Sequence, residues 1–155
     1  YPRWEIVRYM VASVPWPYPE NGAENYVNNV ALPDMAKGIA WFWTIRRREA
    51  PDELMGLICL YDVEDNNRGF WLAPEFQGQG YMREASIAAT DYWFNTLNKP
   101  VLRAPKAAAN SRSRRISDSS GMRLIRTEKK AYVSGLLDSE LWEITRDEWN
   151  ARQVS

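Results

Sequence analysis

The alternation of apolar and polar residues predicts two short helices near the start of the chain. Residues 4–12 and 20–32 carry apolar side chains at helical spacing, and Pro33 is expected to end the second helix. Residues 15–19 lie between them and contain three prolines, which fix φ and remove amide donors. We therefore expect an extended loop between the two helices.

The next part of the chain predicts an antiparallel meander and then a switch to helical spacing. Strand-like runs span 39–45, 54–61 and 69–72, with short polar turns between them. The remaining predicted elements are a helix at 80–97, a short strand at 100–103, a helix at 110–120 that Gly121 ends, and strands at 124–133 and 141–145. This order predicts a mixed α/β (α+β) fold in a single domain over residues 1–155.

One segment, residues 70–85, carries the features of a ligand site. It reads FWLAPEFQGQGYMREA: a strand, a proline, a glycine-rich turn and then a helix. Gly78 and Gly80 permit a tight turn and the close approach of a ligand to the backbone. The amides of residues 77–82 lie at the start of the predicted helix, where unpaired N–H groups and the helix dipole favour an anion such as a pyrophosphate.

Two other phosphate-binding motifs do not fit this segment. A Walker A loop requires a lysine after its last glycine, but Tyr81 follows Gly80. The dinucleotide fingerprint requires a third glycine where Arg83 stands. A glycine turn that only joins a strand to a helix is the simpler alternative.

The run Gln77–Met82 resembles the Gln/Arg-x-x-Gly-x-Gly/Ala signature of the GNAT superfamily, and the whole segment resembles its RimJ/RimL-like branch of N-acetyltransferases. Residues 110–113 (NSRS), followed by Gly121-Met122, resemble that branch's Asn-x-x-Ser…Gly-Phe element, and the ending LDSELWEITRDEW is similar to its C-terminus. The resemblance covers residues 5–149. It implies the GNAT fold, a mixed and mostly antiparallel sheet with a central splayed parallel strand pair, flanked by about four helices.

The resemblance also implies a ligand, acetyl-coenzyme A, and its position, with no metal. The pantetheine arm would lie between the splayed strands, and Asn110 would contact this arm through its side-chain amide. The backbone positions implied to bind the cofactor are Leu72 and Ala73 for the arm, and Gln77, Gly78, Gln79, Gly80, Tyr81 and Met82 for the pyrophosphate.

Several positions depart from the family pattern. Met82 stands where the family has Gly or Ala, so its bulk is expected to crowd the phosphates. Met122 replaces a Phe, and Arg114 replaces a branched apolar residue. No segment matches the family's first strand, so either this strand lies upstream of Tyr1 or the sheet has one strand fewer.

The resemblance implies direct attack of a neutral amine on the thioester. Ser113 matches the serine that protonates the leaving thiolate, with simple hydrogen bonding on a helix surface as the alternative. Tyr132 falls where the branch carries its catalytic Glu, and Glu128 lies four residues earlier on the same strand face. Glu128 is equally well explained as a surface carboxylate. An α-amine, with a pKa of about 7.7–8.0, needs little help from a base.

Composition removes several classes of chemistry. The 155 residues include no histidine, which excludes Ser-His-Asp and Cys-His triads and His-bearing zinc sites. Cys59 is the single cysteine, so a disulfide framework is excluded and a cytoplasmic setting fits. The 20 basic and 20 acidic residues balance, and no stretch approaches the ~20 apolar residues of a membrane span. Neither nucleic acid nor a membrane is expected as a partner.

The charges nevertheless segregate along the chain. Residues 103–130 contain nine basic and two acidic residues, which suits the 3′-phosphate of coenzyme A, with solvated helix faces as the simpler account. Residues 51–84 contain seven acidic and two basic residues, a rim expected to attract a cationic amine. Trp16 and Tyr18 in the proline loop are candidates for lining the acceptor pocket.

Together these features predict an acetyl-CoA-dependent N-acetyltransferase whose acceptor is a primary amine, either a protein N-terminus or a small molecule. Two alternatives stay open: a small-molecule or antibiotic acetyltransferase on the same scaffold, and a non-catalytic acetyl-CoA-binding module. We expect a monomer or a homodimer.

Overall fold

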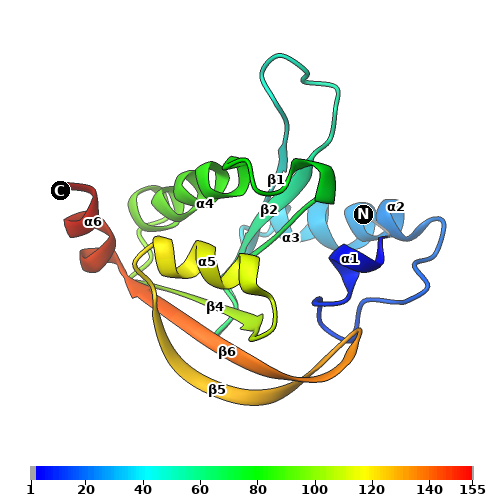
Figure 1. The fold of residues 1–155 in the computed structure, drawn as a ribbon. Coiled ribbons are helices and arrows are strands. Elements are labelled where there is room, and N and C mark those ends of the chain that lie inside the picture. The colour runs from blue at the N-terminus through cyan, green and yellow to red at the C-terminus, as the bar shows by residue number, and fades with distance from the viewer. Residues whose placement is uncertain (1–2, 155) are drawn as a thin grey trace.

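Six strands form two three-stranded antiparallel sheets in the computed structural model, which describes residues 3–154. The first sheet has the order β1-β2-β3 and the second the order β4-β6-β5 (Figure 1). The strand bounds are β1 Ala40–Ile45, β2 Gly56–Tyr61, β3 Arg68–Leu72, β4 Val101–Ala107, β5 Arg123–Tyr132 and β6 Gly135–Thr145.

Helices α4 and α5 lie side by side against the sheets, with α1 to α3 at one end of the molecule and α6 at the other (Figure 1). The α-helices are α1 Trp4–Val7, α2 Gly22–Tyr26, α3 Leu32–Ala36, α4 Tyr81–Asp91, α5 Ser111–Ser119 and α6 Arg146–Val154. Two π-helical segments, η1 Val27–Ala31 and η3 Tyr92–Thr96, continue α2 and α4, and a 3-10 turn, η2, spans Pro74–Phe76.

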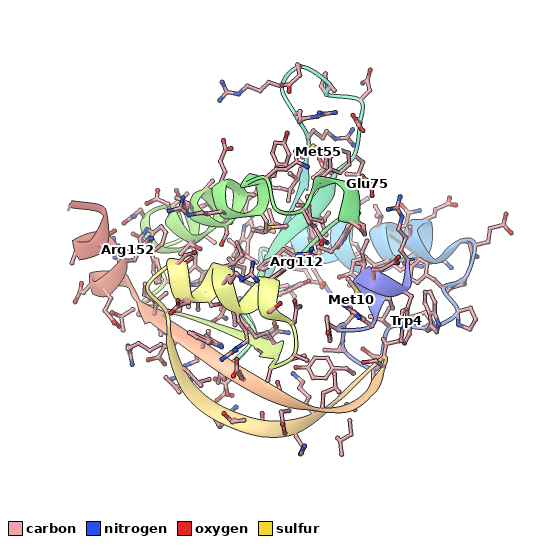
Figure 2. All side chains as sticks on the ribbon, viewed as in Figure 1. Trp4, Met10, Met55, Glu75, Arg112 and Arg152 are labelled. Carbon is pink, nitrogen blue, oxygen red and sulfur yellow. The ribbon has the colours of Figure 1, made fainter. Side chains whose placement is uncertain are left out.

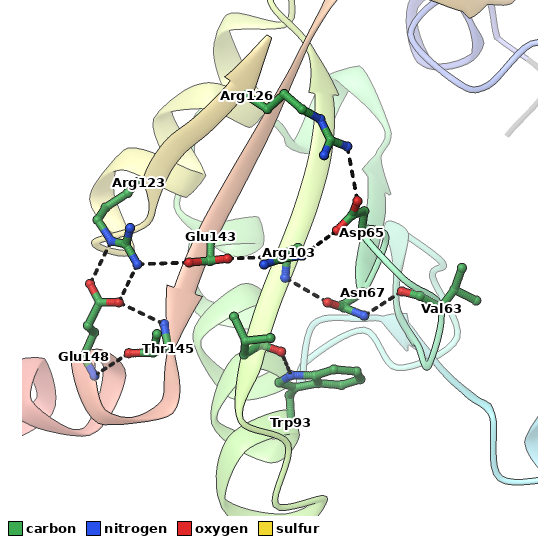
Figure 3. A network of polar contacts seen from close by, with 11 residues as sticks. Val63, Asp65, Asn67, Trp93, Arg103, Arg123, Arg126, Glu143, Thr145 and Glu148 are labelled. Carbon is green, nitrogen blue, oxygen red and sulfur yellow. Dashed lines mark hydrogen bonds and ion pairs between the residues drawn. The ribbon is translucent and has the colours of Figure 1, made fainter. Parts of the chain in front are cut away.

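The two sheets are joined through the buried side chain and backbone of Asn67 (Figure 3). The Asn67 N–H donates to the Arg103 carbonyl at 2.8 Å, and the Arg103 N–H donates to Asn67 Oδ1 at 2.8 Å. The Asn67 amide also donates to the carbonyls of Tyr61 and Val63, at 3.1 and 2.9 Å. Beyond this link, no ladder pairs β3 with β4 within residues 3–154, the arrangement expected of two neighbouring strands that splay apart. We call the region between β3 and β4 the V.

One hydrophobic core fills the space between the sheets and α4. Both sheets contribute to it, with Leu60 on β2 and Leu102 on β4 fully buried. Its largest members are aromatic: Trp93, Phe94, Trp142 and Trp149. The Trp93 indole N–H donates to the Val101 carbonyl at 2.9 Å, so even this buried ring has its polar atom satisfied.

The predicted meander and both long helices are confirmed. Residues 80–97 form α4 and η3, and residues 110–120 form α5 with Asn110 as its N-cap. The final two strands are also present, but β6 begins at Gly135 and β4 continues to Ala107, both beyond the predicted ranges. The early part of β6 was missed because it is largely exposed and has no apolar alternation, while its backbone pairs fully with β5.

Two predictions about the N-terminal region are wrong. Pro33 does not end the second helix, because a π-turn from Val27 to Ala31 widens the helix just before the proline, and the helical path continues to Ala36. The first helix stops at Val7 instead of residue 12. The chain after it pairs with the β5–β6 hairpin, where Val11 bridges Tyr132.

Helix α6 was not predicted, although its N-terminus carries a recognisable signal. The Glu148 N–H donates to Thr145 Oγ1 at 3.2 Å, and the Thr145 N–H donates to Glu148 Oε1 at 3.2 Å. This is a capping box of the form Thr-x-x-Glu. Hydrogen bonds from Arg123 and from Thr145 lower the pKa of Glu148 to about 2.

The Asn67 link predicts a large stability loss on truncation. Asn67→Ala removes three hydrogen bonds and leaves the Arg103 N–H without a partner, so the free energy of unfolding should fall by about 2–4 kcal/mol in urea titrations. Asn66→Ala is the matched control, because the Asn66 hydrogen bond to Val63 uses only the backbone. Equal losses in the two variants would contradict the role assigned to the Asn67 amide.

Candidate functional site

The glycine-rich loop stands at the start of α4 with its backbone open to the surroundings. Gly78 and Gly80 have φ values of +75° and +86°, a region that residues with a Cβ rarely adopt. A Cβ built at either glycine would meet no atom within 4 Å, so the space beside the loop is free of protein. Gly80 is the N-cap of α4 and no side chain caps the helix, so its first N–H groups are available to an anion.

Gln77 ties this loop to the end of β3 and to helix α5. Its amide nitrogen donates to the Leu72 carbonyl at 2.7 Å, and its amide oxygen accepts from the Arg112 guanidinium. Arg112 lies on the side of α5 that faces α4 (Figure 2). The sequence did not distinguish Arg112 from the other basic residues of this region. Residue spacing does not show which side of α5 faces the glycine loop.

The end of β3 offers one of the two predicted backbone positions to a ligand in the V. The Ala73 N–H donates to the Met55 carbonyl at 2.9 Å, so Ala73 faces β2. Successive residues of a strand direct their backbone groups to opposite sides, so Leu72 faces the V. The Ala73 N–H is therefore already used within the first sheet, and of the two backbone positions predicted to bind the cofactor arm, Leu72 is the one that fits this register.

Helix α5 brings the predicted serine to the inside of the molecule. Ser113 is only 8% exposed, and its N–H donates to Asn110 Oδ1 at 3.4 Å. Ser117 lies one turn further along α5 and is fully buried on the same face. The Asn110 oxygen therefore caps the helix, and its predicted contact with the cofactor arm stays a prediction.

Tyr132 and Glu128 lie on one face of the second sheet, as the spacing predicted. Glu128 is paired in register with Ser139, and the Tyr132 hydroxyl is 2.7 Å from Ser139 Oγ. Ser139 Oγ also donates to the carbonyl of Lys106 on β4, at 3.4 Å, so Tyr132 reaches across β6 toward the V. The next residue, Glu140, points to the other face, which α5 covers through the ion pair with Arg114.

The surroundings of Tyr132 and Glu128 do not favour either as a strong base. Burial raises the pKa of Tyr132, so its hydroxyl stays protonated at neutral pH. Glu128 has a side chain that is 55% exposed, and it lies 3.7 Å from Arg126. A protonated phenol can donate a hydrogen bond, and the Glu128 carboxylate is turned to solvent and to Arg126.

Ion pairs reduce the net charge of both the basic and the acidic cluster that the sequence suggested. In the basic cluster Arg103 bridges Asp65 and Glu143, and Arg123 bridges Glu143 and Glu148 (Figure 3). In the acidic cluster, four carboxylates have basic partners within 3.2 Å: Glu53 with Arg47, Asp62 with Lys99, Asp65 with Arg103, and Glu75 with Arg3. The local excess charge is therefore smaller than the residue counts indicated.

The residues around the V fit acetyl-coenzyme A. Met82 is 8% exposed and packs into the core, so its bulk does not crowd the loop, contrary to expectation. Ser86 Oγ and Arg68 Nε are buried without a hydrogen-bond partner among the described residues. Buried polar atoms of this kind normally have partners, and a ligand with amide groups would supply them. Residues 3–154 contain no cluster of His, Cys, Asp or Glu side chains that could hold a metal ion. The same residues contain no helix that is long and apolar enough to cross a membrane.

The proline loop does not form a closed pocket on its own. Trp16 is 42% exposed, and its ring packs against that of Trp4 with centroids 5.4 Å apart.

A separate cavity of about 590 Å³ lies between β1 and the outer face of α4, lined by Trp43, Ala88 and Tyr92 among others. Ser86 projects from a different face of α4, so this cavity is not part of the V.

Comparison with known proteins identifies the family. The model described as "Acetyltransferase (GNAT) domain" matches residues 1–123, most of the chain. The chain belongs to the GNAT acetyltransferase family. The glycine loop, the splayed strands and the two helices over them are therefore the GNAT elements that the sequence predicted.

Several known proteins are similar to this chain in sequence or in structure. The Bacillus subtilis (strain 168) protein named "Putative ribosomal N-acetyltransferase YdaF" is 28% identical over 109 residues, which are 64% of this chain and 58% of that protein. A Vibrio cholerae spermidine N-acetyltransferase, solved with CoA and spermine, has a TM-score of 0.78 and 18% identity, covering 96% of this chain and 87% of that one. The Vibrio fischeri ribosomal-protein-S5-alanine acetyltransferase has a TM-score of 0.76 and 17% identity, covering 92% and 81%.

Proposed function

We propose that this GNAT domain transfers an acetyl group from acetyl-coenzyme A to a primary amine, by direct attack in a complex that holds both substrates. The open loop at Gly78 and Gly80, set at the uncapped start of α4 and at the mouth of the V, carries this proposal. A diphosphate suits these N–H groups, and an extended arm suits the unpaired edge of β3.

The residues proposed to hold the cofactor follow from this geometry. The backbone of Gln77, Gly78, Gln79, Gly80, Tyr81 and Met82 would bind the pyrophosphate, Leu72 would pair with the arm, and Arg112 and Asn110 would bind from α5. When bound, the cofactor supplies an activated thioester. Because Gln77 already holds the Leu72 carbonyl, its side chain would turn away when the arm enters.

The two faces of the second sheet would then serve the two substrates. Ser113 lies on the helix-covered face and is proposed to donate a proton to the leaving sulfur. Tyr132 lies on the opposite face and is proposed to orient the acceptor by donating a hydrogen bond. An amine with a pKa of about 7.7–8.0 already has a neutral fraction at neutral pH, so a site without a strong base suits it.

The acceptor class proposed is a primary amine: a protein N-terminus, whose pKa suits a site without a strong base, or a small amine, whose more basic nitrogen would need more help from the enzyme. The matched relatives are named for a ribosomal protein alanine and for spermidine, which are both primary amines. One observation favours a non-catalytic cofactor-binding module instead: Tyr132 is held protonated and Glu128 is exposed. Thiol release separates these two functions.

The first experiment is a thermal melt with and without saturating acetyl-coenzyme A. At ~100 times the dissociation constant, binding adds ~2.7 kcal/mol, which raises the Tm of a domain this size by about 5–10 °C. Gly80→Asp should abolish the rise, because a carboxylate would occupy the anion position and a Cβ is strained at this φ. A folded protein without any rise contradicts the cofactor site, and a rise without thiol release from any amine supports the module.

Arg112 provides a test of the α5 contribution. Arg112→Ala should weaken acetyl-coenzyme A binding by roughly tenfold in calorimetry at low salt, and by less at high salt, because exposed charge interactions are screened. Arg115→Ala is the control, since Arg115 is an exposed arginine on the same helix. Similar affinities for the two variants would remove Arg112 from the site.

The two candidate acid–base residues are predicted to differ. Tyr132→Phe should lower kcat/KM about tenfold, because it removes the proposed hydrogen bond to the acceptor, whereas Glu128→Gln should change kcat/KM by less than about twofold. In both variants the acidic limb of the pH profile should follow the pKa of the acceptor amine. If Glu128→Gln were the more damaging change and removed that limb, Glu128 would be the base.

A further inference from the structure

Two cations are buried on the helix side of the V, one from each of its walls. Lys106 on β4 is 5% exposed, and its Nζ donates to Ser117 Oγ at 2.5 Å. Arg68 on β3 is 3% exposed and donates to Thr90 Oγ1 at 3.0 Å, while its Nε has no partner among the described residues. Because β3 and β4 diverge from the Asn67 link, these two side chains face the same interior region below α4 and α5.

Neither cation has a carboxylate within ion-pair distance among the described residues. Glu140 lies opposite Lys106 in register and acts on its charge, but the contacts of Glu140 Oε1 are with the Arg114 guanidinium at 2.8 Å and the Trp142 indole N–H at 3.2 Å. Burial lowers the pKa of Lys106 well below its ordinary value, and Arg68 lowers it further, while Glu140 opposes them. Burial also lowers the pKa of Arg68 to about 10, so Arg68 keeps its charge at neutral pH.

Such an arrangement costs stability, because a buried cation without an anion is more costly than an apolar side chain of similar volume. The contacts of Lys106 within the protein are its hydrogen bond to Ser117 and the Trp142 ring, whose centroid lies 6.0 Å from Nζ. Groups that are costly to fold and unpaired at rest are frequent where a reaction creates the missing charge.

Acetyl transfer creates one anion on this side of the V, the coenzyme A thiolate. Ser113, the residue proposed to face the leaving sulfur, lies one helical turn from Ser117 on the same buried face of α5. Ser117 in turn accepts the hydrogen bond from Lys106. The Lys106 amine therefore lies within about one helical turn of the position that the proposed function gives to the sulfur.

We propose that Lys106, with Arg68 behind it, stabilises the coenzyme A thiolate and returns a proton to it. The inference rests on the proposed function. The acceptor nitrogen forms the new C–N bond, and the C–S bond breaks with its electron pair on sulfur. The Lys106 ammonium supplies the proton that Ser113 passes to sulfur, and the proton that the nitrogen loses restores the ammonium by way of solvent. Lys106 therefore ends charged, as it began, and the products are an amide and a thiol.

The first test compares coenzyme A with desulfo-coenzyme A, which lacks only the sulfur. Calorimetry on the unaltered protein should show that coenzyme A binds on the order of tenfold more tightly, as expected for a charge-assisted hydrogen bond. Lys106→Met and Lys106→Gln should both bring this ratio close to one, since neither carries a charge. Lys37→Met, on the exposed end of α3, should leave the ratio unchanged.

The second test sets activity against stability. Lys106→Met should lower kcat about tenfold or more with little change in the KM for acetyl-coenzyme A, while the Tm stays equal or rises because a desolvated cation is removed. A purely structural lysine would give the opposite result, a lower Tm with normal kcat. Lys106→Gln keeps a hydrogen-bonding group for Ser117 and provides the same comparison if the methionine variant does not fold.

The outcomes of these tests distinguish the role of Lys106 from the proposed acetyl transfer itself. An unaltered protein that releases thiol but binds both coenzymes equally would overturn the role of Lys106 and leave acetyl transfer intact. An unaltered protein that neither binds acetyl-coenzyme A nor releases thiol would instead remove the proposed function. Full activity in Lys106→Met, with an unchanged ligand ratio, also overturns the inference.

Discussion

The carboxamide of Asn67 is the constraint on which the V depends. It bonds to the backbone of Arg103 in the second sheet and to the carbonyls of Tyr61 and Val63 in the first. A sheet that continued as a ladder from β3 to β4 would use the backbone groups of Leu72 internally. Because the described strands are joined only near their N-terminal ends, those groups are left to other partners, and the Leu72 carbonyl accepts from the Gln77 side chain.

The glycine loop could be predicted from the sequence because its chemistry is local. Positive φ at Gly78 and Gly80 and the start of a helix are encoded within about ten residues, and no distant contact alters them. The roles of Leu72 and Ala73 depend instead on register against β2, which fixes which residue faces the V. Sequence spacing placed both at the end of the strand but could not distinguish them, since a shift of one residue exchanges the two sides.

The difference between local signals and distant contacts also explains which helices and strands were predicted correctly and which were not. The strands β1 to β3 are short, apolar and separated by turns, so they were predictable, whereas the early part of β6 is held by backbone pairing with β5. The π-turn before Pro33 is a tertiary adjustment that no local pattern announces. Helix α6 is different, because its capping box was present in the sequence and a close reading of Thr145 to Glu148 predicts it.

The polar side chains around the V lower the stability of the fold and are proposed to favour the reaction. Apolar residues would pack between α4, α5 and the sheets at lower cost than Arg68, Lys106 and their hydroxyl partners. Beyond the Asn67 link, β3 and β4 share no ladder among the described residues, and each contributes one buried cation, Arg68 and Lys106. The attraction between these cations and a bound thioester is strongest when the C–S bond breaks and negative charge forms on sulfur. An interaction that strengthens only at that stage lowers the barrier and accelerates the reaction. The unpaired cations therefore belong with the acetyl-transfer chemistry more readily than with the fold.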